Sequence, residues 1–200
     1  MQGVEVWNRG DELAECLLSG YPERDHNLWG ITEDPELFNA VIDGLVDGFD
    51  ECNITHIVGP EARGFIFGPM VACRLGLPFI PARRAGKYLP GRTVGALTAP
   101  DWEGKQVRYE MSADSIPAGA VIGIVDDWLT TGNHVRAIAN IVRSFGADVC
   151  GLSCIVTDGV DGLASEGIRA SYLLCWNEAT SEFSPLDEQR SRSRSVGPQC

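Results

Sequence analysis

The chain has 200 residues, of which 44% are hydrophobic and 22% are charged, and its formal net charge is -12. This composition fits one globular domain with its own core, and no apolar run reaches the roughly 20 residues that a membrane span needs. The negative charge argues against nucleic-acid binding, which depends on Lys and Arg neutralising phosphates. Because the N-terminus also lacks the pattern of a secretion signal, we expect a cytoplasmic protein without nucleic-acid or membrane partners.

Two helices are predicted at the N-terminal end. The shorter covers residues 11–18. The longer begins at Asp34-Pro35, because Asp is a favoured N-cap and Pro fits the first helical position, and its apolar residues recur at helical spacing. Residues 19–32, between the helices, have no period and are predicted to form a loop.

A strand, a helix and a second strand are predicted next. The strand covers residues 54–58, the helix covers 65–75 with Gly76 as its C-cap, and the second strand covers 77–82. Pro69 weakens the helix prediction, since it lacks an amide donor. Strand, helix and strand within about 30 residues indicate a right-handed βαβ unit with parallel strands.

A second unit of the same kind follows further along. Its strands cover residues 121–125 and 149–156, and between them lies a helix with an apolar face from Val135 to Phe145 that Gly146 ends. Two such units predict an α/β fold with a mostly parallel sheet. Ligands of these sheets bind beyond the carboxyl ends of the strands.

The nearly forty residues between the two units have no sustained period, apart from a short predicted strand over 107–111. Loops of this length inside a domain are usually functional lids or disordered links. We interpret the segment as a lid, with a plain β-ribbon as the alternative. The Arg-Ser-rich tail over 184–200 is predicted to be disordered.

Seven cysteines occur without the Cys-x-x-Cys spacing of zinc and redox sites. Free cysteine behaves as a small hydrophobic residue, so reduced and mostly buried thiols are predicted. Cys150 and Cys154 share a predicted strand, where a spacing of four should point both side chains to one face.

Basic residues are concentrated in residues 60–92, which carry a net charge of +5 against -17 for the rest of the chain. Such a concentration attracts a compact anion even when the whole molecule is acidic. A solvated basic face is the alternative. The basic residues are Arg63, Arg74, Arg83, Arg84, Lys87 and Arg92, and the one acid is Glu61.

The most informative segment is the strand over 121–125, which runs into Asp126-Asp127 and then into a Thr-Thr-Gly turn that opens a helix. Amides at a helix N-terminus bind phosphate. The carboxylates can accept hydrogen bonds from sugar hydroxyls or support Mg²⁺. An acidic pair alone often only caps the next helix, but this order of parts predicts a site for a phosphorylated sugar.

Residues 121–134 resemble the phosphoribosyl pyrophosphate motif of the type I phosphoribosyltransferases. Four further segments match the adenine phosphoribosyltransferase branch in the same order, so that the resemblance covers residues 21–157. These segments are residues 34–38, 59–69, 83–91 and 109–111. The resemblance implies one domain over 1–200 with a mostly parallel central sheet flanked by helices. It also implies a small N-terminal hood within 1–50, a flexible lid loop over 83–115, and a homodimer.

The same resemblance implies an enzyme that transfers ribose 5-phosphate from phosphoribosyl pyrophosphate to a purine, with adenine as the nearest acceptor and Mg²⁺ as cofactor. Asp126 and Asp127 would be catalytic, holding the ribose hydroxyls and the metal. The 5′-phosphate would lie at Thr130, Thr131, Gly132, Asn133 and His134. The pyrophosphate would lie at Ala62, Arg63 and Gly64, with added positive charge from Arg83, Arg84 and Lys87. The base would contact Trp29 and Phe65.

The chain departs from the family pattern at four places. Glu103 is the nearest match to the lid glutamate that handles the purine proton, and Glu110 competes for this role. His134 replaces a threonine, and either binds the phosphate or caps the helix. Trp29 lies in a shortened hood segment and either stacks on the base or packs in the core. Trp128 replaces an aliphatic residue, and either packs at the sheet edge or narrows the site.

The motifs that resemble the donor site therefore do not determine which base is the acceptor. Xanthine, hypoxanthine or a specialised metabolite are alternatives to adenine. A regulator that senses phosphoribosyl pyrophosphate or nucleotides without turnover is an alternative from another class.

Overall fold

The structure is a computed structural model that describes residues 9–19, 26–101, 103–159 and 162–185. Eight strands form one sheet in the order β3-β4-β2-β1-β5-β6-β7-β8. The five central strands are parallel, and β3, β4 and β8 add antiparallel edges. The bounds are β1 His56–Pro60, β2 Phe79–Arg84, β3 Thr93–Leu97, β4 Arg108–Ser112, β5 Val121–Leu129, β6 Asp148–Thr157, β7 Arg169–Asn177 and β8 Glu182–Pro185. The predicted α/β fold with a mostly parallel sheet is confirmed.

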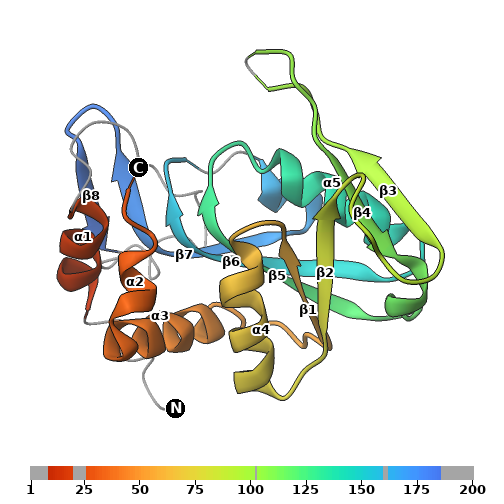
Figure 1. Cartoon of the computed structure of the whole chain (residues 1–200), viewed down its shortest axis with the longest axis horizontal. Coiled ribbons are helices and arrows are strands. Elements are labelled where there is room, and N and C mark those ends of the chain that lie inside the picture. Colours follow the sequence, from red (N-terminus) through yellow and green to blue (C-terminus); the bar gives the residue numbers. More distant parts are fainter. Residues whose placement is uncertain (1–8, 20–25, 102, 160–161, 186–200) are drawn as a thin grey trace.

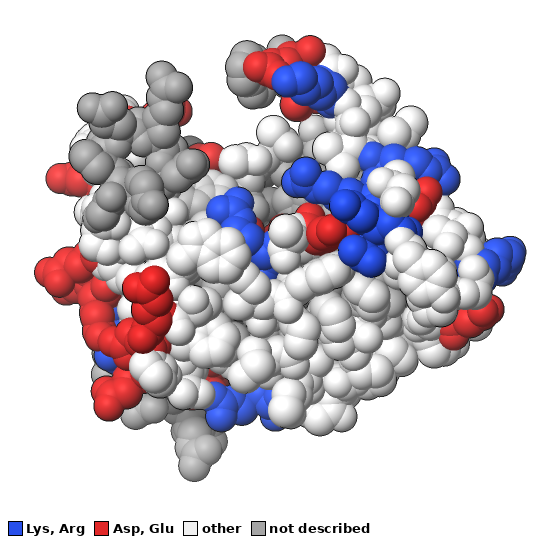
Figure 2. Space-filling model, in the orientation of Figure 1, with Lys and Arg blue, Asp and Glu red and all other residues white. Residues whose placement is uncertain are grey.

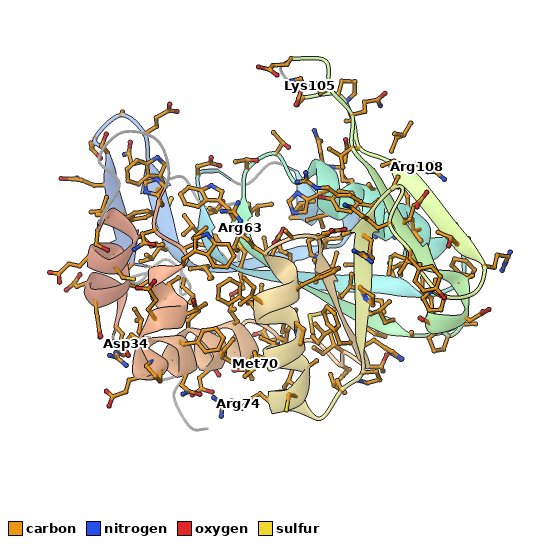
Figure 3. All side chains as sticks on the ribbon, in the orientation of Figure 1. Asp34, Arg63, Met70, Arg74, Lys105 and Arg108 are labelled. Carbon is orange, nitrogen blue, oxygen red and sulfur yellow. A yellow bond between two sulfur atoms is a disulfide. The ribbon has the colours of Figure 1, made fainter. Side chains whose placement is uncertain are left out.

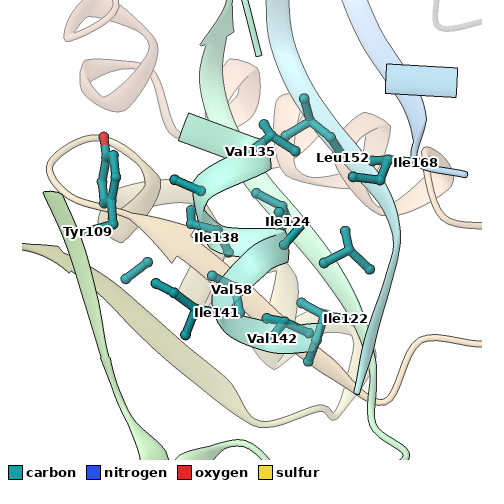
Figure 4. Packing of buried hydrophobic residues seen from close by; sticks show 14 of the residues in the cluster. Val58, Tyr109, Ile122, Ile124, Val135, Ile138, Ile141, Val142, Leu152 and Ile168 are labelled. Atoms are coloured by element: carbon teal, nitrogen blue, oxygen red, sulfur yellow. The ribbon is translucent and has the colours of Figure 1, made fainter. Parts of the chain in front are cut away.

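Helices cover both faces of this sheet (Figure 1). One face carries α3 and α4, with α1 and α2 packed beside them, and the other carries α5. Figure 4 shows apolar side chains of α5 packed onto strands β1, β5 and β6. The bounds are α1 Gly10–Leu18, α2 Gly30–Glu33, α3 Pro35–Asp47, α4 Gly64–Leu75 and α5 Asn133–Arg143, with 3₁₀ turns at Ala113–Ser115 and Leu163–Glu166. In the described part of the chain, none of these helices has the length and apolar character to cross a membrane.

Two helix ends follow the predicted signals, whereas α5 ends at Arg143 with Ser144 as its C-cap, before the predicted Gly146. The Asp34 side chain accepts hydrogen bonds from the amides of Glu36 and Leu37, at 2.8 and 3.1 Å, as expected for an N-cap. Gly76 closes α4 in the left-handed region at φ 66°, and Pro69 is accommodated inside that helix. Part of the predicted N-terminal loop is helical, because residues 30–33 form α2.

The segment between the two βαβ units forms the hairpin β3–β4, and β4 pairs with β2 at the sheet edge. The β-ribbon alternative is therefore correct for the part of this segment that lies next to the sheet. Residues 98–101 and 103–107 lie between the two strands and project beyond the sheet (Figure 1). The prediction of disorder is wrong for the first two residues of the tail, since Ser184 and Pro185 belong to β8 and pair with β7. Residues 186–200 lie outside the described residues.

The prediction of reduced thiols is wrong for Cys52 and Cys150, which form a disulfide, and for Cys175, which is also disulfide-bonded. Cys16, Cys73 and Cys154 are free, and only Cys154 is buried. Cys150 and Cys154 do not share a face. The register of β5 with β6 shifts at residue 150, so that this bulge turns Cys150 toward Cys52 while Cys154 lies in the core beside α5.

Candidate active site

A cavity of about 310 Å³ lies at the carboxyl ends of β1, β2 and β5. Figure 2 shows this hollow, with basic side chains gathered beside it and acidic ones within it. Its lining comes from segments that are far apart in the sequence. The lining residues are Glu61, Ala62, Arg63, Arg84, Tyr109, Asp126, Asp127, Trp128, Thr130 and His134. The turn after β1 and the turn after β5 therefore meet at one cavity, beyond the carboxyl ends of the strands where ligands of such sheets bind.

The turn after β1 is tight. A Cβ atom on Gly59 would lie 2.3 Å from the carbonyl oxygen of Gly64, so the strand end and the start of α4 can approach this closely only with glycine. The Glu61–Ala62 peptide bond within the turn is cis. This turn presents Ala62 and Arg63 to the cavity. Figure 3 shows Arg63 at the cavity end of α4 and Arg74 at the opposite end.

Asp127 is a buried carboxylate in contact with a cation. Its side chain is 5% exposed, and its Oδ2 lies 2.6 Å from Nε of Arg63, which is 47% exposed. Burial, followed by the charge of Asp126, raises the pKa of Asp127 to about 7, and Arg63 opposes this shift. Within the described residues, Asp127 Oδ2 has no partner in hydrogen-bond geometry. This oxygen is therefore available to a further cation or donor.

Asp126 lies beside a different partner. Its Oδ1 accepts the amide of Asp127 at 3.0 Å, and its Oδ2 lies 3.3 Å from Nε2 of His134. His134 is in the first turn of α5, which follows Gly132 in the left-handed region at φ 67°. The side chain of His134 does not cap the helix, and instead faces the carboxylate of Asp126.

The basic segment divides into two groups. Arg84 lines the cavity, and Arg83 lies 3.4 Å from Glu61. Burial opposes ionisation of Glu61, but hydrogen bonds from the Arg84 amide and from Arg83 hold its pKa below the usual value. The second group lies away from the cavity: Arg74 pairs with Asp43, and Arg92 lies over the Phe145 ring. Lys87 lies in an exposed turn after β2.

The remaining predicted site residues are not all brought to the cavity. Within the described chain, its lining does not include Trp29, which is 61% exposed, or Phe65, which packs edge-on against Phe79. Glu103 lies in the projecting loop and forms an ion pair with Lys105, which Figure 3 shows at the tip. Six further predicted residues do not line the cavity but flank its lining along the chain: Gly64, Arg83, Lys87, Thr131, Gly132 and Asn133.

The sequence did not predict site roles for Glu61 and Tyr109. Glu61 is the one acid in the basic segment, and Tyr109 lies on the short strand predicted within the lid. Burial raises the pKa of Tyr109, which keeps its hydroxyl protonated beside Arg84. Two signals in the sequence could have identified them: Glu61 is an acid among basic residues, and Tyr109 is an aromatic residue on a predicted strand.

Trp128 forms one wall of the cavity and belongs to an aromatic cluster. Its ring stacks on His26, with centroids 4.9 Å apart and planes 9° from parallel. Trp176 and Phe183 pack against the other sides of His26, at 4.4 and 4.9 Å. The cluster joins the N-terminal segment to β7 and β8, and it fixes Trp128 in place.

Comparison with known proteins gives one consistent result. The family model described as phosphoribosyl transferase domain matches residues 31–187. The chain is 42% identical to the adenine phosphoribosyltransferase of Streptomyces galbus over 164 residues, which cover 80% of this chain and 88% of that protein. It is 40% identical to the enzyme of the same name from Eremothecium gossypii over 123 residues, which cover 60% of this chain and 64% of that protein.

Solved structures agree with this result. The adenine phosphoribosyltransferase of Thermoanaerobacter pseudethanolicus superposes with a TM-score of 0.74 at 28% identity, covering 83% of this chain and 99% of that one. The Saccharomyces cerevisiae enzyme, solved in complex with an imino-altritol bisphosphate and adenine, gives a TM-score of 0.67 at 29% identity, covering 84% and 98%.

Proposed function

Since the chain belongs to the phosphoribosyltransferase family, we propose that it transfers ribose 5-phosphate from phosphoribosyl pyrophosphate to adenine and releases pyrophosphate. The observation that supports this most strongly is the meeting of two strand-to-helix turns in one cavity. One turn offers Arg63, and the other offers Asp126, Asp127 and the N-terminus of α5. An elongated ligand with a phosphate at each end and hydroxyls between them matches this arrangement.

The donor is proposed to lie across the cavity between the two turns. Its 5′-phosphate would bind the amides of residues 131–134, because N–H groups at the N-terminus of α5 have no acceptor within the helix and the positive end of the helix dipole lies there. Its ribose hydroxyls would donate to Asp126 and Asp127. Its pyrophosphate would bind the turn at 62–64, with the guanidinium groups of Arg63 and Arg84 as charged partners.

The residues also fit a Mg²⁺ ion, which enzymes of this family generally use. The buried carboxylate of Asp127, whose Oδ2 faces Arg63 but has no partner in hydrogen-bond geometry among the described residues, is the kind of ligand the ion prefers. Mg²⁺ is commonly held by one or two carboxylates together with substrate phosphates, so two aspartates suffice. When bound at Asp126 and Asp127, it would neutralise part of the charge on the pyrophosphate.

The proposed reaction forms a bond between a ring nitrogen of the base and the anomeric carbon while the bond from that carbon to pyrophosphate breaks. Positive charge develops on the sugar in the transition state, and Asp126 and Asp127 face that charge. Negative charge develops on the leaving group, which Arg63 and Arg84 face. Catalysis is then mainly electrostatic and positional.

The base is proposed to lie against Trp128, because this aromatic side chain of the lining, unlike Tyr109 beside Arg84, is left free by the donor-binding groups. The proton that the base loses would go to Glu103 once the loop over residues 98–107 closes. Closure would also exclude water from the donor. Lys105 must then release Glu103, with which it pairs in the open loop.

We also propose that the protein is a homodimer, as the family resemblance implies. Exposed apolar side chains such as Met70 and Tyr88, at 43% and 83%, are available for a subunit contact. Light scattering coupled to gel filtration tests this directly. A monomer at micromolar concentration would contradict it.

An acceptor screen tests the proposed activity. The protein is incubated with phosphoribosyl pyrophosphate and Mg²⁺ and with adenine, hypoxanthine, guanine or xanthine in turn, and pyrophosphate and nucleotide are measured. Adenine alone should give equal amounts of both products. Turnover with another base would show that this base, and not adenine, is the acceptor. Donor binding without turnover on any base would favour a regulator that senses phosphoribosyl pyrophosphate.

A further inference from the structure

We propose that His134 is a positioning residue for the donor sugar: its imidazole holds the Asp126 carboxylate in place and so couples the 5′-phosphate subsite to the ribose subsite. This inference rests on the proposed function, because it concerns the same donor. It goes beyond that function by giving the histidine a role that neither phosphate contact nor helix capping describes.

The first observation is where the imidazole points. His134 begins in the turn that would hold the phosphate, yet its Nε2 lies 3.3 Å from Asp126 Oδ2. Both side chains are mostly buried, at 18% and 13% exposure. Among the described residues, Nε2 has no partner in hydrogen-bond geometry. In the tautomer that carries its proton on Nε2, the imidazole can donate to this carboxylate, and such contacts often tighten when the ligand binds.

The second observation is how Asp126 is held on its other side. Oδ1 already accepts the amide of Asp127 at 3.0 Å, which fixes one edge of the carboxylate. His134 faces the other oxygen. A carboxylate held at both oxygens keeps one direction for its remaining lone pairs, and a ribose hydroxyl can donate there without first ordering the side chain.

The two aspartates are thus supported from opposite turns. Arg63, from the turn after β1, faces Asp127, and His134, from the start of α5, faces Asp126. When pyrophosphate draws Arg63 away from Asp127, the contact between His134 and Asp126 remains. His134 therefore keeps the sugar-binding carboxylate in register with the amides that bind the 5′-phosphate.

Ribose 5-phosphate binding is the test, because this probe carries the 5′-phosphate and both hydroxyls but no pyrophosphate and undergoes no turnover. The full chain is titrated with it by calorimetry. We expect His134→Ala to weaken binding about tenfold, in line with the loss of a hydrogen bond to a charged group. His134→Gln should stay within about threefold, because its amide nitrogen can occupy the place of Nε2. Asn140→Ala, at an exposed position of α5, should not change binding.

A double-mutant cycle distinguishes action through Asp126 from direct contact with phosphate. In an Asp126→Ala background, His134→Ala should weaken ribose 5-phosphate binding by less than about twofold, because the carboxylate it positions is gone. A full tenfold loss in that background would overturn the proposal in favour of direct phosphate binding. Unchanged binding in the single variant would overturn it as well. If the unmodified chain does not bind ribose 5-phosphate, the proposed function fails too.

Discussion

The side of the cavity proposed to bind the donor (the donor side) and the aromatic wall are built in different ways. The donor side comes from two strand-to-helix turns, each continuous in sequence, which contribute Arg63, Asp126 and the start of α5. The wall is Trp128 held by His26, Trp176 and Phe183, which come from three separate parts of the chain. One side uses local backbone geometry, and the other depends on tertiary packing.

The donor side and the aromatic wall also differ in the kind of side chain that they contribute. The donor side collects charge in a partly buried place, where a carboxylate such as Asp127 is costly to keep ionised. The wall collects aromatic surface, which favours burial and presents a flat face to a heterocycle. Changes to the donor side should therefore affect activity most, and changes to the wall should affect the acceptor and the stability.

The largest expected effect comes from Asp126→Asn together with Asp127→Asn. Removing both charges that face the developing positive charge on the sugar should lower kcat/KM by at least about 10³-fold. Pyrophosphate release in the presence of adenine measures this. Because the substitutions are nearly isosteric, circular dichroism should show an unchanged fold. Turnover near the original rate would contradict the assignment of the donor side.

Arg63→Ala is expected to have the next largest effect. Losing a charged partner of the pyrophosphate should raise the KM for the donor by about 10- to 100-fold, as hydrogen bonds to charged groups imply. Steady-state kinetics at saturating adenine give this value. Arg74→Ala is the matched control, since Arg74 lies in the last turn of α4, at the opposite end from Arg63, and pairs with Asp43 outside the cavity. Equal effects of the two substitutions would show that only general positive charge matters.

The sequence predicted which residues of the donor side lie together because its signals are local. The residues 121–134 carry strand, carboxylates, turn and helix start in order, and the structure places Asp126, Thr130 and His134 in one cavity with Arg63. The βαβ pattern also fixed which sheet edge the two turns share. Even here the strand was predicted too short, since β5 continues through both aspartates to Leu129.

The aromatic wall could not be predicted in the same way. Trp128 was noticed as bulky, but its stacking on His26 depends on where residue 26, β7 and β8 come together in the fold. No spacing in the sequence encodes that meeting. The disulfide between Cys52 and Cys150 was missed for the same reason, because a bulge in β6 decides the direction of Cys150. Tertiary register, rather than residue type, determines both features.

Trp128→Leu tests the wall and should have a smaller effect on activity. Losing an aromatic contact with the base should raise the KM for adenine by about 2- to 10-fold, while the KM for the donor stays unchanged. Trp29→Leu is the informative comparison, because Trp29 is exposed and lies outside the cavity lining of the described chain. A larger adenine effect from Trp29 than from Trp128 would move the base to the N-terminal segment.

The smallest expected change is in stability and concerns Asp127 without ligand. Its folded pKa is raised from 3.8 to about 7, so between these values the folded state binds a proton that the unfolded state has lost. Stability must therefore fall as the pH rises from about 4 to about 7. Asp127→Asn lacks this contribution and should match the unmodified chain near pH 4 but exceed it by more than about 1 kcal/mol near pH 7.5.

Urea unfolding of both proteins across this pH range measures the difference, and parallel curves would contradict it. Trp128→Leu should change stability in the opposite direction at every pH, because it removes buried aromatic contact from the cluster with His26. If Asp127→Asn stabilises the protein and Trp128→Leu destabilises it, the two results together show two things. The fold tolerates the unfavourable free energy of a buried charge at Asp127, which the donor requires, and the aromatic packing around Trp128 offsets part of that free energy.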